Sequence, residues 1–279
     1  MAPTVADRLR LGAAAGLGAV RWLGHAEDRL WTDVRFRLAL EGTGNEGHER
    51  RVGLRYYALT ERCDRLERLP AERRGVRIDI VGELPERRLY AFTHTPALWV
   101  LLYGMSSARI PLAPVVADWF WADPRSAQRL AAVEAAGGEI IPADGSFEQI
   151  VAAFTAGRHP GLAVDVAGGT PVSFLGKPAS LRSGLAALAL KLDASVVPLV
   201  PTWERGRPVV TLGPAIPPEG EPAELLGRIV AALEAPLLKA PEYWMPYTHE
   251  LWPELADAHR DAFAESAQAA PGREVASVS

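Results

Sequence analysis

The sequence predicts an α/β fold in which helices flank a β-sheet, and two observations lead to this prediction. Short apolar runs typical of buried strands recur along the chain. They lie at residues 76–81, 89–92, 110–116, 139–142, 161–165 and 196–201. Longer segments with apolar residues at helical spacing lie between or beside them, at residues 54–69, 97–103, 125–136, 145–157 and 222–238. Because strands alternate with helices, we expect a layered α/β sheet.

The N-terminal 40 residues have helical spacing and precede a glycine-rich loop at 42–49. A weakly apolar run of about ten residues lies between Arg10 and Arg21, well below the roughly 18 that a spanning helix needs. No signal-peptide cleavage site follows it. We therefore predict an amphipathic helix that lies on the domain or on a membrane surface. The expected organisation is an N-terminal helical segment (1–45), one α/β domain (46–262) and a disordered tail (263–279) of small and polar residues.

Composition excludes several classes of function. The chain has 279 residues and a net charge of -4, so no global basic field would attract nucleic acid. Arginines between residues 50 and 88 alternate with acidic residues, which indicates a salt-bridged surface or a basic face for an anionic partner. Cys63 is the only cysteine, which excludes an internal disulfide and a multi-cysteine zinc site. Cys63 lies in an Arg/Glu-rich helical run, so we do not expect it to be a nucleophile.

The stretch from residue 137 to residue 213 carries several signals in a fixed order. They are a short strand at 139–142, a helix, a buried strand at 161–165, a glycine turn, the run Val-Ser-Phe-Leu-Gly-Lys-Pro, an Arg-Ser-Gly, a helix and the strand at 196–201. This order resembles the lysophospholipid acyltransferase superfamily, and within it the bacterial lauroyl/myristoyl transferases of lipid A biosynthesis. The resemblance covers residues 89–244. It implies a mixed β-sheet flanked by helices, as in glycerolipid acyltransferases.

The superfamily signature is a histidine after a strand, followed five positions later by Asp or Glu. The resemblance implies that His94 is the general base for the acceptor, since it follows the strand at 89–92. The position of the acid holds Trp99, a candidate substrate-binding residue instead. Asp165 ends the strand at 161–165 and is the candidate that replaces the acid, the alternative being a turn residue. Asp118 is a weaker candidate.

Further residues are candidates for substrate binding. Arg125 lies where close relatives carry arginines, and Lys177 and Arg182 flank a Pro-Ala-Ser-Leu block. Arg182 and Ser183 precede a helix, where backbone N–H groups and an arginine form a site for a phosphate. Trp119 opens an aromatic run that either lines an acyl pocket or packs in the core. The alternative for each arginine is a solvated position at the start of a helix.

The resemblance implies acyl transfer from a thioester donor, on acyl-carrier protein or coenzyme A, to a hydroxyl or an amine. The acyl thioester is a co-substrate, and we predict no cofactor and no metal site. We expect a cytoplasmic protein, free or peripheral at the inner face of the membrane. Two alternatives follow from the missing acid. One is a diverged enzyme that acts on a carrier-bound intermediate by different chemistry, and the other is a non-catalytic partner subunit.

Overall fold

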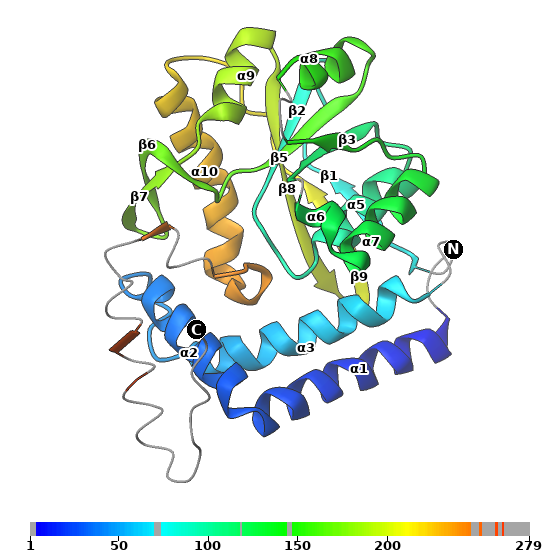
Figure 1. Cartoon of the computed structure of the whole chain (residues 1–279), viewed down its shortest axis with the longest axis vertical. Coiled ribbons are helices and arrows are strands. Elements are labelled where there is room, and N and C mark those ends of the chain that lie inside the picture. The colour runs from blue at the N-terminus through cyan, green and yellow to red at the C-terminus, as the bar shows by residue number, and fades with distance from the viewer. Residues whose placement is uncertain are drawn as a thin grey trace.

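The computed structural model describes residues 4–69, 74–117, 119–143, 147–246, 251–252, 260–261 and 264, with the backbone alone at 26–31, 119 and 125. Its centre is a mixed seven-stranded sheet with helices on both faces (Figure 1). This confirms the predicted α/β class. The strands of this sheet are β1 (Arg77–Ile80), β2 (Arg88–Phe92), β3 (Leu112–Val116), β4 (Ile141–Pro142), β5 (His159–Ala163), β8 (Ser195–Glu204) and β9 (Arg207–Leu212).

The strand order is β1-β9-β8-β2-β5-β3-β4, and only β8 and β9 pair in antiparallel fashion. The central strands β8, β2, β5 and β3 are therefore parallel neighbours. In the register of β2 and β5, Phe92 lies opposite Ala163. Since parallel strands end at the same edge of a sheet, residues that follow Phe92 and Ala163 meet at that edge.

Several helix ends show clear capping chemistry. Asp123 caps α7 by accepting from the Ser126 N–H, and Pro124 follows at the first helical position. Asp193 ends α9 in the left-handed conformation. The helices are α1 (Val5–Gly24), α2 (Ala26–Leu40), α3 (Glu49–Glu67), α5 (Leu98–Ser107), α6 (Trp119–Ala122), α7 (Pro124–Ala135), α8 (Phe147–Thr155), α9 (Gly184–Leu192), α10 (Pro222–Lys239) and the 3-10 helix η1 (Pro241–Tyr243).

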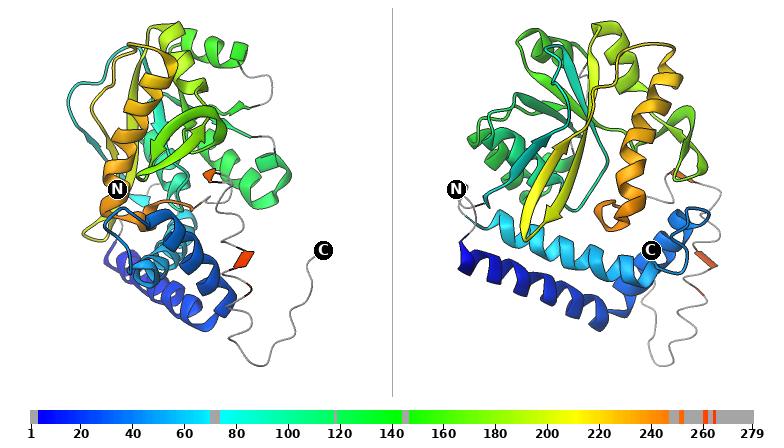
Figure 2. Two further views of the ribbon diagram at one scale, coloured as in Figure 1. Left: turned by 90° about the vertical axis from the view of Figure 1, so that its left-hand side faces the viewer. Right: turned by 180° about the vertical axis from the view of Figure 1, so that it is seen from behind.

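The first three helices form a layer at one end of the molecule, beside the sheet (Figures 1 and 2). The predicted helical segment at 1–40 is two helices, because the backbone at His25 is extended between α1 and α2. Helix α1 lies against α3 so closely that a Cβ on Gly18 would come within 2.4 Å of the Tyr57 carbonyl oxygen. The division at residue 45 remains a prediction, although α3, which follows it, packs on α1 and α2.

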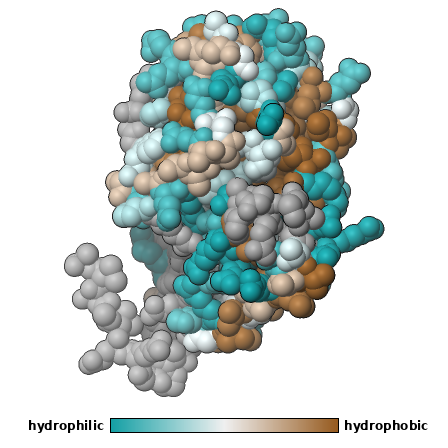
Figure 3. All heavy atoms as spheres, turned by 90° about the vertical axis from the view of Figure 1, so that its right-hand side faces the viewer, coloured by the Kyte–Doolittle hydropathy of each residue, from teal (hydrophilic) through white to brown (hydrophobic). Residues whose placement is uncertain are grey.

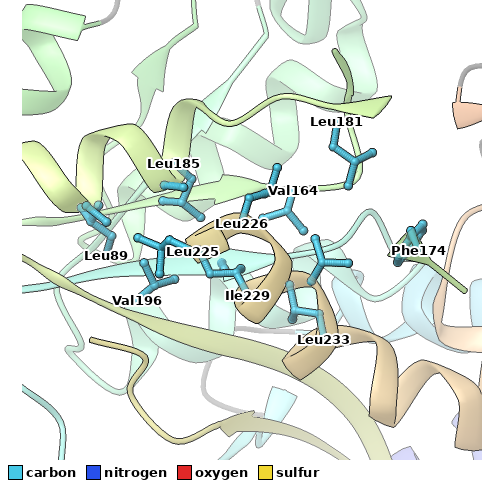
Figure 4. Packing of buried hydrophobic residues seen from close by; sticks show 14 of the residues in the cluster. Leu89, Val164, Phe174, Leu181, Leu185, Val196, Leu225, Leu226, Ile229 and Leu233 are labelled. Carbon is cyan, nitrogen blue, oxygen red and sulfur yellow. The ribbon is translucent and has the colours of Figure 1, made fainter. Parts of the chain in front are cut away.

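The largest core cluster joins the sheet to α9 and α10 (Figure 4). Leu226, Ile229 and Leu233 of α10 point toward the sheet and α9, where they meet residues such as Leu185 and Val196. These side chains are buried, and burial of this kind is the main favourable term in folding. The core therefore fixes the strand ends on which the candidate site depends.

Three features differ from the sequence predictions. A separate antiparallel hairpin of β6 (Ala167–Phe174) and β7 (Lys177–Leu181) turns at Leu175 and Gly176, both at positive φ. Strand β9 and the hairpin were not among the predicted elements. Strand β5 ends at Ala163, two residues before the predicted end, so Asp165 lies beyond the sheet. The sequence also predicts a short terminal helix at residues 243–258, of which 247–250 and 253–258 lie outside the described part of the chain.

Candidate functional site

The site begins with His94 and Asp165, which follow two neighbouring parallel strands. Each lies two residues beyond a paired position, His94 after Phe92 of β2 and Asp165 after Ala163 of β5. The His94 Nδ1 atom lies 3.0 Å from Oδ1 of Asp165. The strand register therefore brings together two residues that are 71 positions apart in the chain.

The side chain of Asp165 is fully buried, and both of its oxygens accept hydrogen bonds. The backbone N–H of His94 donates to both of them at 3.0 Å. The indole Nε1–H of Trp244 donates to Oδ2 at 2.9 Å. The His94 carbonyl in turn accepts from the Met245 N–H at 2.9 Å. The carboxylate and the histidine backbone are thus fixed from several directions, as preorganised sites require.

This geometry determines which ring nitrogen of His94 is basic. An imidazole that donates through Nδ1 to a carboxylate carries its basic lone pair on Nε2. The carboxylate also stabilises the imidazolium that forms when Nε2 takes a proton. The pair can therefore act as a general base and then as a general acid.

His94 and Asp165 line a cavity of about 730 Å³, a volume typical of small-molecule sites. Most of its wall is apolar, with side chains from β2, β3, β5, α5, α6, α8 and α9. They include Phe92, Leu98, Leu102, Phe120, Leu162 and Leu185. Among the described residues of the wall, the polar side chains are His94, Asp165 and Arg182. An apolar cavity with a few polar groups suits a molecule that combines a hydrocarbon chain with a reactive polar end.

Hydrophobic residues also reach the surface on the side of the molecule that carries α6 and α7, among hydrophilic ones (Figure 3). Trp121 of α6 and Phe147 of α8 are both exposed. Phe147 belongs to the cavity wall as well. The apolar lining of the cavity therefore continues to the protein surface.

Trp99 occupies the position at which the superfamily signature has an acid, and it lies in the cavity wall. Its ring packs edge-on against Phe120, with 6.2 Å between the ring centroids, and only 5% of Trp99 is exposed. The Arg129 guanidinium lies 5.2 Å from the centroid of the Trp99 ring. Arg129 also donates to Glu67 at 2.8 and 3.1 Å and to Asp64 at 3.2 Å. The indole is thus held between α6 and a partly buried ion pair that joins α7 to α3.

Arg182 and the start of α9 reach the same cavity. The exposed Arg182 lines the cavity with Gly184, and its Nε donates to the Ala167 carbonyl at 3.2 Å. Ser183 is the residue before α9, and its side chain makes no capping hydrogen bond to the helix. The structure therefore brings Arg182 and the first helical residue to the site, with Ser183 between them but outside the cavity wall.

The structure does not bring Lys177 to this site. Its ammonium group donates to the carbonyl oxygens of Ala39 and Glu41, which are the last turn and the C-cap of α2, and lies 5.8 Å from the Trp252 ring centroid. Burial lowers the pKa of Lys177. A cation at a helix C-terminus stabilises the helix dipole, so the contacts of Lys177 are structural.

Three candidates have no described side chain. Arg125 lies in the first turn of α7 and Trp119 opens α6, but the structure gives only their backbone. Asp118 lies outside the described residues. Cys63 is buried in α3, and burial raises the pKa of its thiol, so it is unreactive. Among the residues that the structure describes, no three His, Cys, Asp or Glu side chains form a group that could hold a metal.

The contact between Trp244 and Asp165 is absent from the sequence predictions. Trp244 is 79 positions from Asp165 and follows η1. An aromatic residue near the chain end is typical of core packing, and Trp244 does pack edge-on against Phe174. The one feature of the sequence that could indicate a hydrogen bond to Asp165 is the indole N–H itself, because a buried indole N–H usually has an acceptor.

The fold and the site together define an acyltransferase-like α/β protein. The family model of the bacterial lipid A biosynthesis acyltransferases matches residues 96–253, more than half of the chain. The chain therefore belongs to this family. The match includes Asp165, Arg182 and Trp244 and begins two residues after His94. No curated protein matches the chain.

Proposed function

We propose that this protein transfers an acyl group from a thioester donor to a hydroxyl or an amine, with His94 as general base and Asp165 as the residue that orients it. The observation that supports this most strongly is the 3.0 Å contact between His94 Nδ1 and Asp165 Oδ1 at an apolar cavity. Membership of the acyltransferase family supports the reaction class. Asp165 would replace the acid that the signature places at Trp99.

In the proposed reaction, Nε2 of His94 takes the proton of the acceptor hydroxyl or amine. The acceptor atom forms a bond to the thioester carbonyl carbon, and the C=O π electrons move to the oxygen. When the tetrahedral intermediate collapses, the C–S bond breaks and the thiolate leaves. The imidazolium returns the proton to the thiolate, so one acyl ester or amide and one thiol form. Asp165 stabilises the imidazolium in between.

The remaining parts of the cavity have roles consistent with this reaction. The apolar wall around Phe120 and Leu162 would hold the acyl chain. Arg182 and the N-terminus of α9 would stabilise a donor phosphate or the oxyanion. The donor would be acyl-carrier protein or coenzyme A, which places the reaction in the cytoplasm.

Trp99 is the observation that favours the alternatives. A buried indole at the position of the signature acid is expected in a diverged enzyme that acts on a carrier-bound intermediate by other chemistry, or in a partner subunit. A diverged enzyme would need His94 without releasing a thiol. A partner subunit would not need His94 at all.

The test is thiol release from a panel of acyl-CoA and acyl-carrier donors with a hydroxyl or amine acceptor. His94→Ala abolishes release, and Asp165→Asn lowers it by about 10²-fold or more, because the imidazole loses its orienting partner. His48→Ala is the control, since His48 is an exposed histidine before α3. No release from folded wild-type protein with any donor would contradict the proposal. Equal release by wild type and His94→Ala would contradict the role of His94.

A further inference from the structure

The cavity at His94 extends over both faces of the sheet. Its wall contains side chains of two separate hydrophobic clusters. Leu162 of β5 packs in the cluster that includes α8 and α9, and the next residue, Ala163, packs in the cluster that includes α5 and α6. Because successive residues of a strand point to opposite faces, the cavity has two arms that meet at the carboxyl end of β5. The α8–α9 arm is lined by Phe147, Ile150, Leu162, Leu185 and Leu188, and the α5–α6 arm by Leu98, Trp99, Leu102, Phe120 and Ala163.

The α5–α6 arm is closed by a buried indole. Trp99 and Leu102 in its wall are only 5% and 1% exposed. Behind the Trp99 ring lies the Arg129 guanidinium, which is 5.2 Å from the ring centroid and forms an ion pair with Glu67. A hydrocarbon chain that entered this arm would therefore meet a ring that is held from behind.

The α8–α9 arm begins beside the polar groups of the site and follows α9. Arg182 and Gly184 lie in the wall at the start of α9, where the proposed reaction places the thioester oxygen or the donor phosphate. Gly184, Leu188 and Lys191 lie on one side of this helix, at spacings of four and three residues. An acyl chain whose carbonyl group is at the start of α9 can therefore extend along this side of the helix.

Phe147 stands at the other end of the α8–α9 arm. It is the first residue of α8, and the ammonium group of Lys191, in the last turn of α9, lies 4.3 Å from the centroid of its ring. The ring lines the cavity and blocks the path of a chain that follows α9. Behind it, the end of a hydrocarbon chain would have to desolvate the ammonium group, which is unfavourable.

The rise of α9 gives the length of this arm. Gly184 and Lys191 are seven positions apart, which corresponds to about 10 Å along a helix. An extended hydrocarbon chain advances by about 1.25 Å per carbon, given standard bond lengths and bond angles. The α8–α9 arm therefore accommodates about eight carbons beyond the start of α9.

We infer that the acyl chain lies in the α8–α9 arm and that Phe147 limits the length of chain that the protein can bury. The inference rests on the proposed function, because that function assigns an acyl chain to this cavity. It adds a specificity-determining residue, since methylenes beyond Phe147 contribute nothing to binding.

The experiment measures the affinity of the full chain for saturated fatty acids of increasing length, by displacement of a fluorescent fatty acid. The carboxylate stands in place of the thioester carbonyl, so binding requires no turnover. In the wild type, affinity rises about fourfold with each added methylene and stops rising at a limiting length. Phe147→Ala moves this limit to longer chains, because the end of the chain can occupy the place of the ring. Leu188→Phe moves it to shorter chains by up to about four carbons, since Leu188 lies about 4.5 Å before Lys191 along α9.

Two matched controls lie outside the α8–α9 arm. Leu102→Phe makes the same substitution at a buried leucine of the α5–α6 arm, and Trp121→Ala removes an aromatic residue that is 40% exposed, close to the 44% of Phe147. Both controls keep the wild-type limit, and all four variants keep the wild-type circular dichroism.

Three outcomes overturn the inference. The first is a limit that shifts in Leu102→Phe and not in Leu188→Phe, because the chain would then lie in the α5–α6 arm. The second is a limit that Phe147→Ala leaves unchanged, and the third is a wild type that binds no fatty acid. A limit that moves as described in a protein that releases no thiol supports the inference and contradicts the proposed function alone.

Discussion

At the scale of single residues, the acid that faces His94 comes from a different element than the superfamily signature expects. An acid five positions after the histidine would lie on α5, but α5 carries Trp99 there. Asp165 reaches the imidazole from the end of β5 instead. A carboxylate at Nδ1 orients an imidazole and stabilises its protonated form. The proposed role of Asp165 therefore places the acid on a different element from the one that carries it in the signature.

Trp99→Asp restores the sequence spacing of the signature, and we expect it to damage the protein. Asp165 already occupies the Nδ1 side of His94, so a second carboxylate adds no function there. Trp99 packs against Phe120 and Arg129, so a small charged residue would leave a cavity and a desolvated charge. The free energy of unfolding in urea should fall by about 3 kcal/mol or more, and thiol release should not rise.

The control for this variant is Trp121→Asp, because Trp121 is 40% exposed on α6. Its cost should stay under about 1 kcal/mol, as is usual for surface substitutions. Thiol release that increases in Trp99→Asp would show that the site lacks an acid after all.

The two residues of the candidate dyad could be selected from the sequence because each follows an apolar strand at a position where the resemblance to the acyltransferase superfamily implies a functional residue. Their contact could not be derived, since it depends on β2 and β5 being neighbours in the sheet. Trp244 could not be selected at all, because nothing local distinguishes an indole that packs from one that also donates to Asp165. Lys177 was selected from the sequence but does not lie at the site. It flanks the Pro-Ala-Ser-Leu block, and its ammonium group binds carbonyl oxygens at the end of α2.

At the scale of elements, substitutions at two glycines of α1 measure the effects of helix packing and of helix propensity individually. Gly18→Ala places a Cβ 2.4 Å from the Tyr57 carbonyl oxygen, so α1 and α3 must move apart. Gly16→Ala places a Cβ in open space and replaces a poor helix former with a good one. In urea unfolding we expect Gly18→Ala to destabilise by about 1–3 kcal/mol and Gly16→Ala to stabilise by about 0.5–1 kcal/mol. Equal effects would mean that α1 does not pack on α3 as described.

Strand β5 begins with a histidine whose burial makes stability depend on pH. His159 is buried, and its Nδ1 lies 3.1 Å from the Arg88 carbonyl oxygen. Burial lowers its pKa to about 4, and the nearby Arg88 charge acts in the same direction. The unfolded chain, with a pKa of about 6.5, binds a proton that the folded protein does not. Stability from this group is therefore complete above about pH 6.5 and is lost as the pH falls toward 4.

We expect the free energy of unfolding to decrease by about 1–2 kcal/mol between pH 7 and pH 5 through His159. His159→Gln should remove that part of the decrease, and His48→Gln, at an exposed position, should leave it unchanged. Urea titrations of the three proteins at both pH values measure the difference. An identical pH dependence in wild type and His159→Gln would show that folding does not lower the pKa of His159.

The central strands could be predicted as elements because both faces of a parallel strand are buried, which gives apolar runs such as residues 89–92. The hairpin of β6 and β7 could not, because β6 is largely exposed and has no such run. The break at His25 follows Gly24, but Gly12, Gly16 and Gly18 lie inside the same helix, so a glycine alone did not mark its end. Strand β5 ends two residues before Asp165, earlier than predicted, because the pairing with its partner β2 ends at Ala163. Local pattern therefore predicts buried elements, and tertiary pairing sets their limits.

At the scale of the whole molecule, the segment after α10 joins the candidate site to the N-terminal layer. Met245 donates to the His94 carbonyl. The next carbonyl, of Pro246, lies 3.3 Å from an Arg35 nitrogen of α2. Glu242 forms an ion pair with Arg55 of α3 at 3.6 Å. A displacement of the N-terminal helices would therefore shift this segment and with it the backbone of His94. Neither α2 nor α3 contributes to the cavity wall.

Two buried tryptophans of this region test how the segment supports the site. Trp244 and Trp252 both pack with Phe174, but only Trp244 donates its Nε1–H to Asp165. Nε1 of Trp252 is buried and has no hydrogen-bond acceptor within the described residues. Trp244→Phe keeps an aromatic ring and leaves Oδ2 of Asp165 without its donor, while Trp252→Phe removes no hydrogen bond of the carboxylate.

We therefore expect kcat for thiol release to fall about tenfold in Trp244→Phe with KM for the donor unchanged, because the imidazole is held less firmly while the cavity wall is intact. Trp252→Phe should keep the wild-type kcat, although both variants lose some stability through packing. A loss of kcat that is the same in both variants would mean that the aromatic cluster, and not the indole hydrogen bond, supports the dyad.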